Sequence, residues 1–466
     1  MSAIHLAFHI DHKKGHKIVT PKWRSSGLLA EVMRSGSPSP LPQNDLLARS
    51  KALQEIFSAR SYWERLWIRP EQILAPHTTL ICGRRELNVD ALYPILSMME
   101  DLKRHKAEDE DFHSVHELWI EPLTKLVKLF TVSDSKSRPS LASNLRDHST
   151  ALCSEPRDYV YALLNVSAPL YLLPNYSLSL EEVYIRSTQA IIYHDQDLTV
   201  IFLKTEEKSS KAPYLTSWVP AFDKDNSESI SHFSSNDLMA YDSGCFPITR
   251  RVIHTGRCRT LPIHGTFIST INATGVKPVA TTFRNQKANR DFSDHLHDTI
   301  NEIAKGKRPS STVSPEHVWR ILFLDSYPLE GNCARISHSE DIKRAFPDDL
   351  NATRRGKLTF NFRERLNHLP GNICLCKSTD NRLAVVVGDI KRGDRIFVAR
   401  GASIPLILRG PSKIRKNDFI CDSCDDMIGS SCYTFVGGSY VDGIMDGEVL
   451  DMTSDGRLRE ETVFLM

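Results

Sequence analysis

The sequence has no long hydrophobic run and little net charge. Its most apolar stretch, YVYALLNVSAPLYLLP at 159–174, is interrupted by Asn165, Ser167 and Pro169 and is too short to span a bilayer. Lys and Arg number 59 and Asp and Glu 57, a net charge of +2, so no overall field would attract nucleic acid or an anionic membrane. The start, MSAIHLAFHIDHKKGHK, lacks the pattern of a signal peptide. We therefore expect a cytoplasmic protein that neither spans a membrane nor binds nucleic acid.

Several motifs of common enzyme sites are also absent. The sequence contains no G-x-G-x-x-G and no G-x-x-x-x-G-K-[ST], which excludes the two usual phosphate-cradling loops. It has no G-x-S-x-G nucleophile elbow and no H-E-x-x-H zinc motif. No repeat of fixed period is present. None of these common motifs therefore nominates an active site.

The ten cysteines give only a weak indication of a metal site. Cys374 and Cys376, followed by Cys421, Cys424 and Cys432, could together hold a structural zinc. The first pair has the wrong spacing for a zinc ribbon, however, and the second lies in the loop-like stretch NDFICDSCDDMIGSSC. We favour ordinary buried or loop thiols and predict no metal.

At 466 residues the chain is too long for one ordinary core, so several domains are expected. Residues 1–44 read as an irregular arm ending in the Ser/Pro linker RSGSPSPLPQND, and 206–258 as a polar linker or insert. Between them, 45–205 carries helical and strand patterns. The last part, 259–466, is expected to be a mixed α+β domain ending in a small β-barrel or sandwich.

Local patterns predict individual elements in these regions. Ser179 and Glu182 form a capping box at the start of a helix. Pro156 suits the first position of another helix. Strands are expected at 77–83, 197–204 and 259–271, at three runs within 382–410, and as a pair within 433–445.

Three stretches together resemble the fungal heterokaryon-incompatibility (HET) domain proteins. The first is RLWIRPEQILAPHTTLICG, in which Arg65, Trp67, Glu71, Cys82 and Gly83 stand in matching places. The second is EPRDYVYALLNVS followed by PNYSLSLEEVY, and the third comprises GDRIFVARGASIPLILR and YVDGIMDGE. The second stretch matches the family at Pro156, Arg157, Asp158, Tyr161, Ala162, Leu163, Leu164, Pro174, Tyr176 and Tyr184. The resemblance covers about residues 45–466.

The resemblance implies a fold and a function. HET domains resemble TIR domains, so an α/β, doubly wound fold is expected in the first part of the chain. The family's early strand, its Tyr-x-Trp-Gly-like turn and its WIDAICINQ-like strand are not found in residues 1–60. We therefore expect a truncated TIR-like remnant, lacking the N-terminal half of the HET domain. The implied function is fungal non-self recognition and programmed cell death through protein partners, another HET-type or incompatibility protein being one candidate.

Glu71 can be interpreted in two ways. In TIR domains that cleave NAD, a Trp-x-x-x-Glu helix carries the catalytic glutamate, and Trp67 and Glu71 match that spacing. A carboxylate near the ribose would stabilise an oxocarbenium-like transition state. Alternatively, Glu71 has a structural role. Pro70 then occupies a first helical position, and Glu71 in the first turn stabilises the helix by ~0.3–1 kcal/mol through the helix dipole. Trp63 and Trp67 pack as an i, i+4 pair on the core side. We favour this structural interpretation, keeping the NAD hydrolase and a non-functional remnant as alternatives.

Arg157 and Asp158 open a predicted helix, where Asp158 would serve the dipole and Arg157 would pair with an acid elsewhere. We favour a structural clamp here over a clamp between domains. Gly393, Gly401, Gly443 and Gly447 are expected at turns where a side chain is unwelcome.

Overall fold

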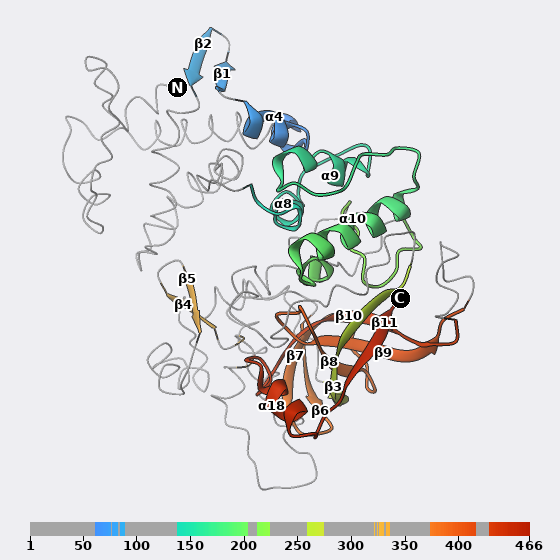
Figure 1. Ribbon diagram of the computed structural model, residues 1–466. Coiled ribbons are helices and arrows are strands. Elements are labelled where there is room, and N and C mark those ends of the chain that lie inside the picture. Colours follow the sequence, from blue (N-terminus) through green and yellow to red (C-terminus); the bar gives the residue numbers. More distant parts are fainter. Residues whose placement is uncertain are drawn as a thin grey trace, which may run out of the picture. The chain divides into compact units, whose positions relative to one another are not determined.

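The computed structural model describes residues 61–75, 77–82, 84–88, 138–203, 212–223, 259–274, 321, 324, 326–329, 332–335, 373–415 and 428–466 (Figure 1). The chain divides into two compact units, Met1–Arg138 and Pro139–Met466. This division falls inside the predicted 45–205 domain. The predicted arm at 1–44 and most of the predicted linker at 206–258 lie outside the described residues.

The described part of the first unit contains two short helical elements and a hairpin. The 3₁₀ helix η1 spans Ser61–Glu64 and α4 spans Ile68–Leu74. Strand β1 (Thr79–Cys82) confirms the strand predicted at 77–83, and it pairs antiparallel with β2 (Arg85–Asn88). A doubly wound fold is built on a mostly parallel sheet. Because the described strands of this unit are antiparallel, the doubly wound remnant stays a prediction.

The second unit begins with helices: α8 (Leu141–Asp147), α9 (Asp158–Tyr161), η4 (Leu164–Val166), α10 (Leu180–Asp195) and η5 (Thr199–Leu203). At the start of α10 the Ser179 hydroxyl accepts from the Glu182 amide, and the Glu182 carboxylate accepts from the Ser179 amide. The predicted capping box is therefore confirmed. Pro156 lies two residues before α9, not at its first position as predicted.

The strand predicted at 197–204 is wrong, because this run forms η5. The side chain of Asp197 accepts a hydrogen bond from the Thr199 amide at 2.8 Å, which starts the turn. Val200 and Ile201 are fully buried in it. The Leu198 amide donates to the Gly401 carbonyl at 2.8 Å, so tertiary contacts outweigh the strand propensity of the β-branched residues.

The rest of the second unit is a sheet that closes on itself. Its strands are β3 (Leu261–Thr274), β6 (Ile373–Ser378), β7 (Leu383–Val387), β8 (Arg395–Ala399), β9 (Leu406–Lys413), β10 (Ser431–Val441) and β11 (Glu460–Leu465). The ring runs β10-β7-β6-β3-β8-β9 and returns to β10, with β11 bridging β10 and β3. Among the described strands of this sheet, β10 and β11 pair in parallel and the other pairs are antiparallel. The strand predicted at 259–271 is confirmed as β3, and the three predicted at 382–410 as β7, β8 and β9. Of the two architectures expected for this end of the chain, the pairings give a barrel-like ring.

The pair of strands predicted within 433–445 is wrong, because β10 is one continuous strand. Gly437 and Gly438 do not form a turn between two strands. They allow β10 to pass close to its neighbours: a β-carbon on Gly437 would lie 1.9 Å from the Val387 carbonyl oxygen. The glycines therefore serve close packing inside a strand rather than a hairpin.

Two smaller elements complete the described chain. The hairpin of β4 (Ser326–Leu329) and β5 (Asn332–Arg335) is antiparallel. Helix α18 (Glu448–Ser454) contributes Val449 to the apolar cluster of the barrel. That cluster comprises Ile271, Cys374, Cys376, Ala384, Val386, Ile390, Ile396, Val398, Ile407, Val441, Ile444 and Val449.

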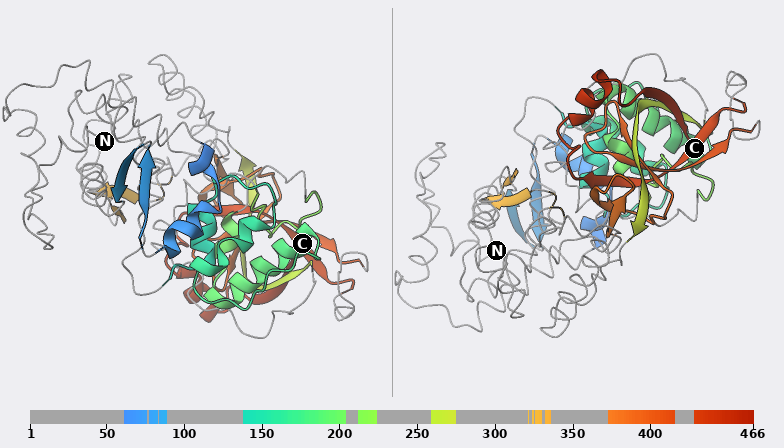
Figure 2. Two further views of the ribbon diagram at one scale, coloured as in Figure 1. Left: turned by 90° about the horizontal axis from the view of Figure 1, so that it is seen from above. Right: turned by 90° about the horizontal axis from the view of Figure 1, so that it is seen from below.

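The helices and the barrel of the second unit pack together. Figures 1 and 2 show α8, α9 and α10 gathered on one side of the strands. The rings of Phe202 and Phe435 meet edge to face with centroids 5.9 Å apart, and the Trp218 indole donates to the Arg259 carbonyl at 2.9 Å. The helical segment before residue 205 thus belongs to the same compact unit as the strands after 259. Within the described part of the chain, no helix combines the length and apolar character needed to cross a membrane.

Candidate functional site

In the first unit the side chains of Trp63 and Trp67, predicted to pack as a pair, lie in different environments. Trp63 is 9% exposed, whereas Trp67, just before α4, is 41% exposed. The predicted core-side pair is therefore wrong: the short 3₁₀ helix at 61–64 and a separate α4 break the continuous helix that an i, i+4 pair requires. Pro70 is the third residue of α4 rather than the first, but still in the turn whose N–H groups have no partner within the helix.

Glu71 is exposed in the first turn of the seven-residue helix α4. An acid there meets the positive end of the helix dipole, in line with the structural interpretation. Arg65, the other charged residue that matches the family in this stretch, is also exposed. Cys82 ends β1, and Gly83 lies outside the described residues.

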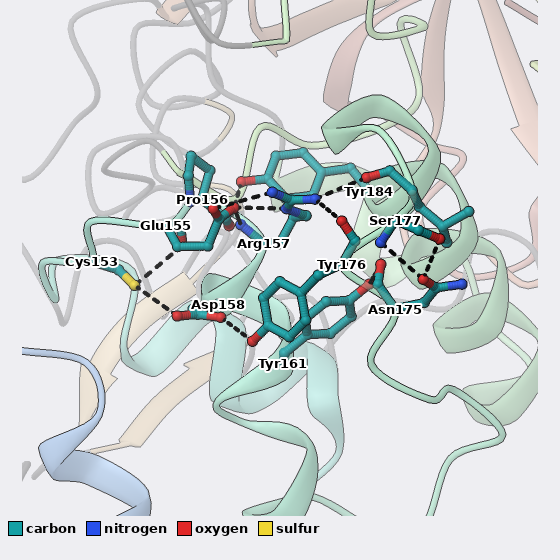
Figure 3. Close-up of polar contacts among 11 residues, drawn as sticks. Cys153, Glu155, Pro156, Arg157, Asp158, Tyr161, Asn175, Tyr176, Ser177 and Tyr184 are labelled. Atoms are coloured by element: carbon teal, nitrogen blue, oxygen red, sulfur yellow. Dashed lines mark hydrogen bonds and ion pairs between the residues drawn. The ribbon is translucent and has the colours of Figure 1, made fainter.

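In the second unit the structure brings the polar residues of the second family motif together around Arg157 (Figure 3). Its guanidinium donates to the two carboxylate oxygens of Glu155, at 2.7 and 3.2 Å. The third nitrogen donates to two backbone carbonyls, that of Tyr176 at 2.5 Å and that of Leu178 at 3.1 Å. The predicted acid partner of Arg157 is thus only two residues away, and the long-range partners are carbonyl oxygens.

Three tyrosine hydroxyls complete this network. Tyr176 donates to the Asp158 carboxylate at 2.5 Å, Tyr161 to the Asn175 carbonyl at 3.1 Å, and Tyr184 to the Pro156 carbonyl at 3.0 Å. The rings of Tyr161 and Tyr176 meet edge to face at 5.2 Å, and the Arg157 guanidinium lies 5.5 Å from the Tyr176 ring centre. We call this network the Arg157 clamp. It comprises Glu155, Pro156, Arg157, Asp158, Tyr161, Asn175, Tyr176, Leu178 and Tyr184.

The pKa is raised for two tyrosine hydroxyls of the clamp and for the neighbouring Cys153 thiol. The hydrogen bond to Asp158, reinforced by burial and by the carboxylate's charge, raises the pKa of Tyr176 to about 12. Burial raises the pKa of Tyr184. Burial also raises the pKa of the Cys153 thiol, whose sulfur lies 3.3 Å from the Glu155 carbonyl oxygen. Because the thiolate is the reactive form of cysteine, Cys153 is a poor nucleophile in this environment. The arrangement therefore suits positioning of the backbone better than proton transfer or nucleophilic attack.

The clamp fastens one loop to one helix inside a single unit. Glu155, Arg157 and Asp158 belong to α9 or its approach, whereas Asn175, Tyr176 and Leu178 belong to the loop before α10. All of these residues lie in Pro139–Met466. The predicted structural clamp matches these contacts, which run within a unit rather than between units. The role of Glu155 was not predicted, although an acid two residues before an arginine is a signal for such a pair.

The glycines singled out near the carboxyl end stand at turns, as predicted. Gly443 has φ 73° and Gly447 has φ 85°, in the region that side chains rarely adopt. Gly447 directly precedes α18, and the Gly443 carbonyl accepts a hydrogen bond from Arg382 at 3.1 Å. Gly393 and Gly401 also have positive φ. These residues shape the chain and carry no reactive group.

Among the residues that the structure describes, no group of three or more His, Cys, Asp or Glu side chains is placed to hold a metal ion. Cys374, Cys376 and Cys432 are buried and form no disulfide. The other two cysteines considered for zinc, Cys421 and Cys424, lie outside the described residues.

No protein-family model, characterised protein or solved structure matches this chain. The resemblance to HET proteins therefore rests on the sequence motifs quoted above.

Proposed function

We propose that this chain is a HET-type protein of the kind that acts in fungal vegetative incompatibility and programmed cell death, and that it works in the cytoplasm through contacts with other proteins. The observation that carries the proposal is the Arg157 clamp. Pro156, Arg157, Asp158, Tyr161, Tyr176 and Tyr184 match the second family motif and all take part in it. Together these residues fix the loop before α10, which gives a structural reason for the motif.

The chemistry of the clamp favours binding over catalysis. Its tyrosine hydroxyl groups already donate to carbonyl or carboxylate oxygens, and burial raises the pKa of the neighbouring Cys153 thiol, which disfavours the reactive thiolate. Glu71, the residue that an NAD-cleaving enzyme would use, is exposed in a short helix. A catalytic carboxylate is normally set in a cavity with partners that tune it. We therefore place the contact function first and NAD hydrolysis through Glu71 second.

The experiment is inducible expression of the full chain in a filamentous fungus, with cell death scored by dye uptake. We expect death with the unaltered chain and with Glu71→Ala, and loss of death with Arg157→Ala. Arg457→Ala is the matched control, since Arg457 also pairs with an acid two residues away but is 61% exposed and outside the clamp. Immunoblotting would establish that each variant accumulates to the same level.

Two results would count against this function. Full accumulation of the unaltered chain without death would remove the incompatibility role. Death that disappears in Glu71→Ala, together with Glu71-dependent release of nicotinamide from NAD by the purified chain, would favour the hydrolase. Glu64→Ala is the control for the enzyme assay, because Glu64 is an exposed acid in the neighbouring helix η1.

A further inference from the structure

The segment Pro169–Tyr176, which we call the Tyr171 loop, exposes large apolar side chains. Tyr171 is 102% exposed, Leu173 86% and Tyr176 50%. Pro169 and Pro174 are exposed as well. Single apolar residues on a surface are common, but several within one short segment are characteristic of an interaction site.

The backbone of the Tyr171 loop is fixed at both ends. On the leading side the Ala168 amide donates to the Pro139 carbonyl at 2.7 Å. At the other end the Tyr161 hydroxyl donates a hydrogen bond to the Asn175 carbonyl, and the Arg157 guanidinium donates to the carbonyls of Tyr176 and Leu178. A loop already ordered loses little conformational entropy when a partner binds. The clamp thus keeps Tyr171 and Leu173 exposed in a loop that needs little further ordering when a partner binds.

The side chains at the centre of the loop are of the kinds that give binding energy. Tyrosine is enriched among residues whose truncation weakens interfaces most, because it buries a large area with few rotatable bonds. Tyr171 and the neighbouring leucines are flanked by Pro169 and Pro174, each of which fixes one backbone angle. The loop is therefore able to insert a tyrosine and a leucine into a complementary apolar pocket.

The surroundings of the loop in the sequence are acidic. From residue 155 to 182 the chain carries four acids, Glu155, Asp158, Glu181 and Glu182, and a single base, Arg157, so the local net charge is 1 − 4 = −3. Arg157 is already paired with Glu155. A partner that carries lysine or arginine beside its apolar pocket would be favoured, whereas a second copy of this surface would meet like charge.

From these observations we propose that the Tyr171 loop is a docking surface for a protein whose apolar pocket is edged by lysine or arginine side chains. The proposal rests on the contact function above and gives it a place and a partner chemistry. The loop supplies the apolar anchor, and the acids that flank it in the sequence supply orientation and selectivity.

The test uses a library of short random peptides displayed on phage and selected on the immobilised full-length protein. We expect selected peptides to combine aliphatic or aromatic residues with lysine or arginine. A selected peptide, made synthetically and labelled, should bind about tenfold or more weakly to the double variant Tyr171→Ser/Leu173→Ser. Glu181→Lys should also weaken it, as should high salt. Tyr214→Ser is the matched control, since Tyr214 is 72% exposed in the same unit but outside the loop, and it should bind normally.

Three results would overturn the proposal: selected peptides without basic residues, equal binding to the double variant, or a dimer in sedimentation that the double variant abolishes. The last would assign the loop to a second copy of the chain. Circular dichroism would establish that the double variant is folded. The fungal death assay is independent of peptide binding. Loop-dependent peptide binding without cell death would support the docking surface and contradict the incompatibility role. Cell death without loop-dependent binding would support the incompatibility role and contradict the docking surface.

Discussion

The Tyr176 hydroxyl donates a 2.5 Å hydrogen bond to the Asp158 carboxylate, joining residues 18 positions apart. This bond places the first turn of α9 beside the end of the Tyr171 loop (Figure 3). Asp158 thereby acts at the start of its own helix and also fixes a distant loop. The Arg157 guanidinium reaches the same loop through its carbonyl oxygens. The neighbouring residues 157 and 158 thus fasten one loop in two ways.

Replacing Arg157 with alanine should destabilise the second unit. The change removes the guanidinium bonds to the Tyr176 and Leu178 carbonyls and those to the Glu155 carboxylate. Because the Arg157 side chain is 24% exposed, water will replace part of what is lost, and we expect a decrease of about 1–2 kcal/mol in the free energy of unfolding. Urea denaturation followed by tryptophan fluorescence measures it. Arg457→Ala should change the same quantity by less than about 0.5 kcal/mol; equal losses in both variants would show that the clamp adds nothing.

The contribution of Tyr176 should depend on alkaline pH. Its pKa is raised from 10.0 to about 12 in the folded chain, so the neutral phenol is favoured by folding. The stabilisation is then fully present below about pH 10 and is lost as the pH rises through about 12. Tyr176→Phe should cost about 1 kcal/mol near neutral pH and progressively less above pH 10. Urea denaturation of both proteins across this range measures the difference.

The control for this titration is Tyr214→Phe, which removes an exposed phenol from the same unit without touching the clamp. Its difference from the unaltered chain should not follow the same course. A Tyr176→Phe difference that stays constant from pH 8 to 12 would contradict a hydrogen bond from Tyr176 to Asp158 that disappears when the phenol ionises near pH 12.

The ion pair between Arg409 and the buried Asp394 should stabilise the barrel. The Arg409 guanidinium donates to the two Asp394 oxygens, each at 2.8 Å, and the Lys391 amide donates to the same carboxylate at 2.7 Å. Asp394 is 2% exposed, so Asp394→Asn removes the charged partner of Arg409. The Arg409 side chain is 34% exposed, so water offsets part of the loss, and we expect a decrease of about 1–3 kcal/mol in the free energy of unfolding. Thermal and urea denaturation measure the loss. Asp455→Asn removes an acid from an exposed pair and should cost little; a similar cost in both variants would contradict the role given to Asp394.

Local sequence signals predicted the elements whose determinants are local. The capping box of Ser179 and Glu182 needs only residues three apart, and it is present. The strands β7, β8 and β9 follow from apolar runs separated by turn glycines. In these segments the same few residues decide both the pattern and the structure.

The elements that the sequence could not predict depend on distant neighbours. The run of residues 199–203 has strand propensity but forms η5, while the adjacent Leu198 bonds to Gly401. The two glycines of β10 resemble a turn until Val387 of β7 is placed against them. In the clamp, the partners of Arg157 are backbone carbonyls, which no side-chain pattern reveals. The six-strand ring itself follows from pairings between strands far apart in the chain.

The close passage of β10 and β7 gives a sharp test of the barrel. A β-carbon on Gly437 would lie 1.9 Å from the Val387 carbonyl oxygen, a backbone atom that cannot rotate away. Gly437→Ala must therefore separate the two strands or distort β10, and we expect a loss of about 3 kcal/mol or more in the free energy of unfolding. Gly456→Ala is the matched control, because Gly456 has φ 72° but nothing within 4 Å of an added β-carbon. It should cost only about 1 kcal/mol of backbone strain. Urea denaturation compares the two, and a Gly437→Ala chain as stable as Gly456→Ala would contradict the closure of the ring between β7 and β10.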